Sequence, residues 1–152
     1  MHGYERLLCL LDQTVDAQKK LLELEHRKTS IITHGTVQEM DEVLLLEQSL
    51  IMKVAGLEER REAMQKEMGL AGMTLREIVN QYDSENASGF TDRLHALSSV
   101  LLELQKTNRL NMSILKSRLS VLNRLMVITG MKEPVLTYEK MEQTHKAHVS
   151  LI

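Results

Sequence analysis

The stretch from residue 88 to residue 129 constrains the fold more than any other part of this sequence. It has no proline, and its only glycine, Gly89, lies at one edge. At ~100° per residue, one side of a helix would carry an almost continuous apolar stripe. This core stripe consists of Leu94, Leu97, Leu101, Leu104, Asn108, Met112, Leu115, Leu119, Leu122 and Met126. The pattern predicts one amphipathic helix of roughly 40 residues, about 60 Å long at ~1.5 Å per residue.

A second apolar stripe begins halfway along this helix, on nearly the opposite side. This second stripe consists of Leu110, Ile114, Val121, Leu125 and Ile128. A helix that is apolar on two sides has to be buried on both or bind a partner. We therefore expect the second stripe to pack against the C-terminal tail, against another copy of the chain, or against a different protein.

The composition favours helices throughout the chain. Aromatic residues make up 3% of the sequence, with no tryptophan and one phenylalanine, whereas methionine occurs ten times. Strands of sandwiches and barrels are rich in β-branched and aromatic residues, so this composition indicates an all-α protein. Seven glycines and one proline leave few places for turns, which requires long elements.

Charge and cysteine content narrow the functional classes. The formal net charge is −2, with acidic and basic residues interspersed, which argues against a nucleic-acid-binding protein. Cys9 is the only cysteine, so no internal disulfide can form and a reducing compartment fits. No apolar run reaches the ~18 residues that a membrane-spanning helix needs. We expect a cytoplasmic protein without membrane insertion.

Two helices are predicted before the long one begins. Residues 4–33 form the first, which is expected to end at Gly35 with the glycine in the left-handed conformation. Thr36 and Glu39 have the spacing of a capping box and open the second helix, over residues 37–68. The two helices are expected to form an antiparallel hairpin.

A short third helix is predicted between this hairpin and the long helix. Thr74 and Glu77 again have capping-box spacing and open a helix over residues 75–82. The polar residues 83–86 are expected to end it.

Together these elements predict an antiparallel helical bundle or coiled coil of three long helices plus one short helix. The last helix exceeds the hairpin by roughly ten residues, about 15 Å, and is expected to project from the bundle. The bundle spans residues 1–130. Gly130 and Pro134 mark its boundary, and residues 131–152 are expected to form a flexible or partner-ordered tail.

No catalytic constellation is evident. Glu23 with His26, and Glu142 with His145, have the Glu-x-x-His spacing of di-iron bundle proteins. However, Glu23 points away from the apolar face of its helix, and the other pair lies in the polar tail. We find no nucleophile motif or phosphate-binding loop, and no set of metal ligands. We therefore expect a protein that is not an enzyme and uses no cofactor or metal.

Several polar residues fall on the apolar faces of the predicted helices. Glu25, Glu47, Arg61 and Asn108 lie within apolar stripes, and Asn111 flanks one. Such groups would each cost several kcal/mol if buried without a partner. Either they pair across helices and set the register, as a buried asparagine does in coiled coils, or the interface is wet and they reach solvent. We favour the first interpretation, a structural polar core.

Three short patterns resemble one known family. They are carried by Met40, Glu47, Glu58 and Arg61 in the second predicted helix, by Asn108, Asn111 and Leu115 in the last helix, and by Tyr138 in the tail. With these residues the chain resembles the FlgN family of flagellar export chaperones. That family usually has glycine after the tail tyrosine, where this chain has Glu139.

The resemblance implies a small cytoplasmic helical chaperone for hook-associated proteins, the components of the hook–filament junction. Such chaperones deliver their clients to the flagellar type III export apparatus, and their long last helix and tail take the substrate. This assigns the second stripe and Tyr138 to partner binding, in a protein expected as a monomer or weak homodimer. The alternative is a structural coiled-coil scaffold that self-associates tightly through the same stripe.

Overall fold

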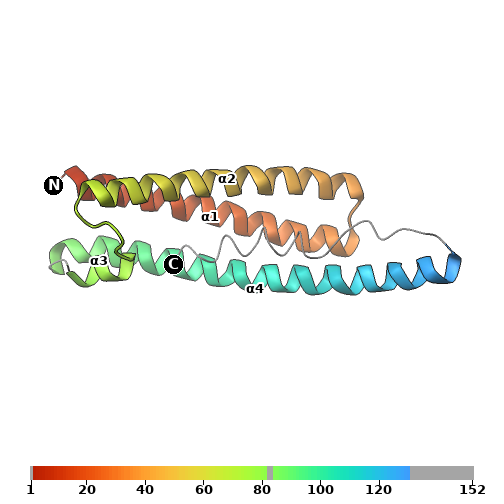
Figure 1. The fold of residues 1–152 in the computed structure, drawn as a ribbon. Helices are drawn as coiled ribbons and strands as arrows, with labels where there is room; N and C mark the ends of the chain where they lie inside the picture. The colour runs from red at the N-terminus through yellow and green to blue at the C-terminus, as the bar shows by residue number, and fades with distance from the viewer. Residues whose placement is uncertain (1, 82–83, 131–152) are drawn as a thin grey trace.

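The computed structural model describes residues 2–81 and 84–130 and contains four helices (Figure 1). These are α1 (His2–His34), α2 (Val37–Glu67), α3 (Leu75–Gln81) and α4 (Ser84–Thr129). Helix accounts for 92% of the described residues, and no strand occurs among them. The all-α prediction is confirmed, and the predicted helix boundaries agree with the structure to within two residues except at the start of α4.

The three long helices run side by side, with α1 contacting both of the others. α2 is antiparallel to α1, to which a two-residue connection joins it. α4 is parallel to α1, because the contacts between these helices keep a nearly constant separation in sequence. Asp12 pairs with Arg93, and Thr33 contacts Arg118, separations of 81 and 85 residues. The short α3 packs beside the first part of α4 and reverses the chain into it.

Both predicted capping boxes are present. The backbone N–H of Glu39 donates to Thr36 Oγ1 at 3.2 Å, and the Thr36 N–H donates to the Glu39 carboxylate at 2.9 Å. Thr74 and Glu77 make the same two bonds at 3.2 and 2.7 Å. Each box satisfies two backbone donors that the first turn of a helix leaves without intrahelical partners.

Two local predictions were wrong. Gly35 does not adopt the left-handed conformation. A glycine is required at this position for another reason, because a Cβ there would lie 2.8 Å from the Ile31 backbone. The polar residues after α3 do not form a longer turn, since α4 already begins at Ser84. Serine, aspartate and asparagine favour helix starts as well as turns, so the sequence there was compatible with either structure.

The hydrophobic core is concentrated toward the end of the bundle where α3 lies. It joins leucines of α1 and α4 to the loop before α3, with Phe90 almost fully buried. The Tyr4 and Phe90 rings meet edge to face, with centroids 5.9 Å apart. The core stripe of α4 is buried from Leu97 to Leu104, is only half-buried at Leu115, and is exposed at Leu122. Burial therefore decreases along α4 toward its C-terminal end.

The cause of this decrease is the length of α4. Arg118 Nη2 donates to the Thr33 carbonyl at 2.5 Å, one residue before α1 ends at His34. The remaining residues of α4, 119–129, extend past the α1–α2 turn, as Figure 1 shows. This overhang is about 16 Å long at ~1.5 Å per residue, close to the projection that the sequence predicts.

Candidate protein-binding surface

The overhang exposes apolar side chains on both predicted stripes. The exposed fractions are 55% for Val121, 51% for Leu122, 50% for Leu125 and 78% for Ile128. Single exposed leucines are common on protein surfaces, whereas several exposed apolar side chains gathered on one short helical segment are typical of a candidate interaction site. Among the described residues no other helix runs beside this segment.

The remaining members of the predicted partner-binding set lie in different surroundings. Leu110 is half exposed and borders a groove of about 400 Å³ whose opposite wall is the C-terminal end of α1. Ile114 is half-buried, so it contributes less free surface than the pattern indicated. Tyr138 lies outside the described residues.

A buried polar cluster anchors α4 to α1 two turns before the overhang. The Asn111 amide nitrogen donates to the Glu25 carbonyl at 3.1 Å and to the Glu25 carboxyl at 3.0 Å. The Asn111 carbonyl oxygen accepts a hydrogen bond from Thr29 Oγ1 at 2.5 Å. Asn111 and Glu25 are each 1% exposed. The amide is therefore held at both of its ends, which fixes the position of α4 relative to α1.

The same cluster connects α1 to α2 through a lysine that the helical periodicity did not predict. Lys28 is 1% exposed, and its Nζ lies 3.1 and 3.2 Å from the two carboxylate oxygens of Glu47. It also lies 3.7 Å from Glu25 Oε1. The polar cluster thus contains Glu25, Lys28, Glu47 and Asn111, and it joins all three long helices. The only sequence signal for Lys28 is its three-residue spacing from Glu25.

The polar cluster contains two carboxyl groups but only one ammonium group. One of the two carboxyl groups is therefore expected to bind a proton. A side-chain hydrogen bond to Glu47 is among the causes that raise the pKa of Glu25, and a bond between two carboxyl groups needs a proton on one of them. Burial and then this hydrogen bond raise the pKa of Glu25 from 4.5 to about 8, while the Lys28 ammonium acts in the opposite direction. Near neutral pH, protonated Glu25 leaves Lys28 and Glu47 as a neutral ion pair.

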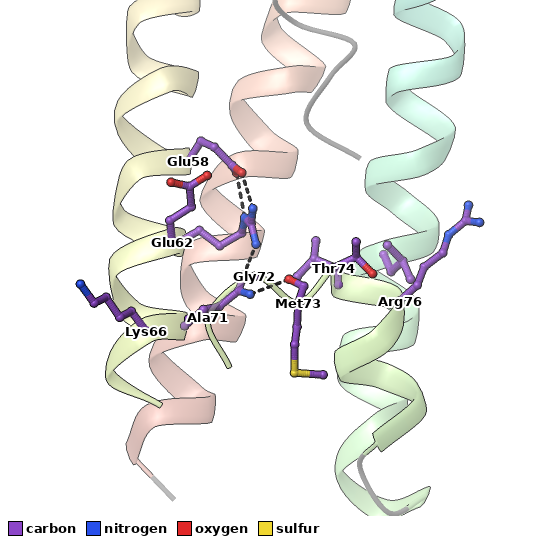
Figure 2. Close-up of a pocket in the computed structure, with 12 residues that line it drawn as sticks. Glu58, Glu62, Lys66, Ala71, Gly72, Met73, Thr74 and Arg76 are labelled. Atoms are coloured by element: carbon purple, nitrogen blue, oxygen red, sulfur yellow. Dashed lines mark hydrogen bonds and ion pairs between the residues drawn. The ribbon is translucent and has the colours of Figure 1, made fainter. Parts of the chain in front are cut away.

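Arg61 belongs to a separate network at the other end of α2. It pairs with Glu58 on the same helix, Nε to Oε2 at 2.8 Å, and donates to the side chain of Gln65. Gln65 in turn donates to the Met73 carbonyl at 2.9 Å. Figure 2 shows this network beside a pocket of about 550 Å³ between the end of α2, the following loop and the start of α3. Arg61 thus supports the α2–α3 loop, and Glu47 lies in the other network.

Two further polar side chains are buried along α1 and α4. Asn108 is 9% exposed, and within the described part of the chain its Oδ1 accepts no hydrogen bond. Gln18 is fully buried, and its amide has no hydrogen-bond partner there either. These two groups lower the stability of the fold, because their polar atoms lose water on burial.

The structure also bears on the enzymatic and membrane alternatives. Over residues 2–81 and 84–130, no three His, Cys, Asp or Glu side chains come together as a metal site. The helices in these ranges include none that is long and apolar enough to cross a membrane.

Comparison with known proteins gives one match. The model of the family described as FlgN protein matches residues 1–146 of this chain. Neither the curated proteins nor the solved structures include a match. Because the matched region covers nearly the whole sequence, the chain belongs to the FlgN family, the flagellar export chaperones.

Proposed function

We propose that this protein holds hook-associated proteins in the cytoplasm, keeps them unassembled, and delivers them to the flagellar type III export apparatus. It acts by binding alone, without catalysis or a cofactor. The overhang of α4 is the main binding surface, continued by Ile114 and Leu110 toward the bundle and by Tyr138 in the tail. The observation that carries the proposal is the exposure of Val121, Leu125 and Ile128 on a helix that has outrun its neighbours.

The shape of the overhang favours a helical client segment. Helix-on-helix docking places an apolar stripe of one helix against that of another, and the overhang offers such stripes over about three turns. A hook-associated protein with an amphipathic terminal helix would self-associate through that helix, and covering it would keep the subunit soluble until export.

The polar cluster supports this use of α4. Asn111 is fixed to Glu25 and Thr29, and Arg118 is bonded to the end of α1. The root of the overhang is therefore held in place before a client arrives. A preformed surface loses less conformational entropy on binding than a disordered one.

The test is a pair of acidic substitutions on the overhang, Val121→Asp with Leu125→Asp. Both side chains are at least half exposed, so the change in folding free energy should stay under ~0.5 kcal/mol per site. Binding to a purified hook-associated protein should be lost, because each carboxylate would have to be desolvated against apolar groups. Affinity by calorimetry and thermal melting are recorded on the same variants.

The matched control is Leu45→Asp with Met52→Asp on α2. These residues are each 69% exposed, and they lie on the side of α2 away from its buried residues, so the same chemical change is made elsewhere. The control variant should bind normally. Unchanged binding by the overhang variant would place the client elsewhere, with the tail around Tyr138 as the next surface to test.

The competing function is a scaffold that self-associates through the second stripe. Sedimentation at several protein concentrations separates the two functions. A chaperone should remain a monomer or a weak dimer, whereas tight assembly of the purified chain, abolished by Val121→Asp with Leu125→Asp, would favour the scaffold.

A further inference from the structure

The charged side chains on the overhang and on the turns of α4 just before it are all basic. Between Glu103 and Glu133 the sequence has no acidic residue, although the whole chain has 21. The same interval contains five basic residues on α4, which are Lys106, Arg109, Lys116, Arg118 and Arg124. A chain with a net charge of −2 thus presents a cationic segment that leads into the overhang and includes Arg124 within it, beside several exposed apolar side chains.

The positions of these cations follow from the helical repeat. At ~100° per residue, Arg124 lies about 60° around the helix from Val121 and about 40° from Ile128, so it borders the second stripe. Arg109 lies about 60° from Met112 and borders the core stripe on its other edge. Both arginines are exposed, and neither takes part in an ion pair with another described residue.

Arg118 differs from these two because it lies between the stripes and donates to the Thr33 carbonyl. Lys116 lies on the same side of α4 as Arg109 and makes contacts of its own. Within the overhang, Arg124 therefore borders the exposed apolar side chains. Arg109 lies about 15 Å earlier on α4, beside the exposed Leu110, where a helix docked on the overhang would continue along α4. In a coiled coil, flanking residues of this kind meet the flanking residues of the partner helix and select its charge.

We propose that the segment received by the overhang is an amphipathic helix with acidic residues flanking its apolar stripe. This inference rests on the proposed function of the same surface, because it names the chemistry of the client segment. Apolar contact provides most of the affinity, and the arginines select among amphipathic helices and speed their encounter.

An anionic membrane surface is the other ligand that a basic amphipathic helix can fit. The structure favours the protein partner. Glu39, Asp41 and Glu42 are exposed at the start of α2, at the end of the hairpin from which the overhang emerges. An anionic bilayer that spread from the overhang onto the end of the hairpin would be repelled by these carboxylates, whereas a single helix can dock on α4 without covering them.

The experiment uses two synthetic peptides of about 20 residues, roughly 30 Å as helices. They share one leucine stripe and differ only in their flanking residues, glutamate in one and lysine in the other. Binding to the full chain is measured by fluorescence anisotropy at about 50 mM and about 500 mM NaCl, since salt screens exposed charges. The glutamate peptide should bind about tenfold more tightly at low salt, and the ratio should approach one at high salt.

The double variant Arg109→Glu plus Arg124→Glu tests whether these two arginines cause the preference for the glutamate peptide. This variant should lose or reverse the preference for the glutamate peptide. The matched control, Lys53→Glu plus Arg60→Glu, changes the net charge equally on exposed positions of α2 and should keep it. If the control loses the preference equally, the effect comes from net charge and the inference is overturned.

The remaining outcomes separate this inference from the proposed function. Equal binding of both peptides, abolished by Val121→Asp with Leu125→Asp, overturns the charge preference and leaves the function intact. If neither peptide binds while a purified hook-associated protein does, the inference also fails. If that protein does not bind either, the proposed function itself fails. Tight binding of the full chain to phosphatidylglycerol vesicles, without a preference between the peptides, would favour the membrane.

Discussion

Replacing Glu25 with glutamine tests the shared proton in the polar cluster. Burial raises the pKa of Glu25 from 4.5 to about 8, so between these pH values the folded chain holds a proton that the unfolded chain releases. The free energy of unfolding must then fall as pH rises, by about 1.4 kcal/mol per pH unit for one proton. The stabilisation of the folded chain by the proton on Glu25 is complete below pH 4.5 and is lost as pH rises through about 8.

Glutamine reproduces the protonated carboxyl without its titration. Its amide oxygen can accept the bond from Asn111 that Glu25 Oε2 accepts now, at 3.0 Å. Its amide nitrogen can donate toward Glu47. The variant should therefore match the natural protein near pH 5 and become more stable than it by a few kcal/mol near pH 8.

The assay is urea denaturation followed by circular dichroism at a series of pH values from about 5 to about 9, spanning the window in which the folded and unfolded chains differ in bound protons. Glu23→Gln on the exposed side of α1 removes one carboxyl without touching the cluster, and it should leave the pH dependence unchanged. If the curves of Glu25→Gln and the natural protein stay parallel, Glu25 is ionised in the folded state and the account of the cluster is wrong.

Three further substitutions test the packing of the helices by the same denaturation assay. Lys28→Met should cost about 3–5 kcal/mol, because it leaves the Glu47 carboxylate buried without its cation; a neutral result would mean that the pair adds no net stability. Arg61→Ala should cost about 1–3 kcal/mol, because it leaves the Gln65 side-chain oxygen without its donor and the Glu58 carboxylate without its cation, and an unchanged melting temperature would contradict this. Leu115→Ala should cost about 1–2 kcal/mol, less than the ~2–5 kcal/mol of a fully buried leucine, since Leu115 is half-buried; a larger loss would show that more of α4 is covered in solution.

The helical repeat predicts most of the fold. Apolar spacing identifies four helices and the side that each buries, and capping residues at Thr36 and Thr74 place two helix starts. The projection of α4 follows from helix lengths alone. The start of α4 could not be placed because a polar first turn and a polar loop use the same residues.

The partners of the inward polar residues were harder to predict. Periodicity shows which face a side chain occupies but not what it contacts. Glu47 and Arg61 share one stripe of α2, yet Glu47 meets Lys28 of α1 and Arg61 meets Glu58 of its own helix. Lys28 was missed because lysine is rarely buried, so a lysine near an apolar face is normally read as solvated.

The exposed apolar surface at the end of α4 was predictable because α4 has more apolar faces than the hairpin can cover. The sequence could not show at which residue of α4 the neighbouring helix α1 ends. In the structure this residue is Arg118, which is bonded to the end of α1. Beyond it, Leu122 of the core stripe is exposed together with the second stripe. Both stripes of the overhang, rather than the second stripe alone, are available to a partner.

The central claim, that the overhang receives the client, is tested most directly by hydrogen exchange with mass spectrometry on the full chain, alone and with a purified hook-associated protein. Residues 119–129 lack neighbouring helices in the described structure, so their amides should exchange quickly in the free protein. On binding, exchange should slow strongly over 119–129, while the exposed side of α2 around Leu45 and Met52 should be unaffected. Protection confined to α1 and α2, with the overhang exchanging as fast as in the free protein, would contradict the account.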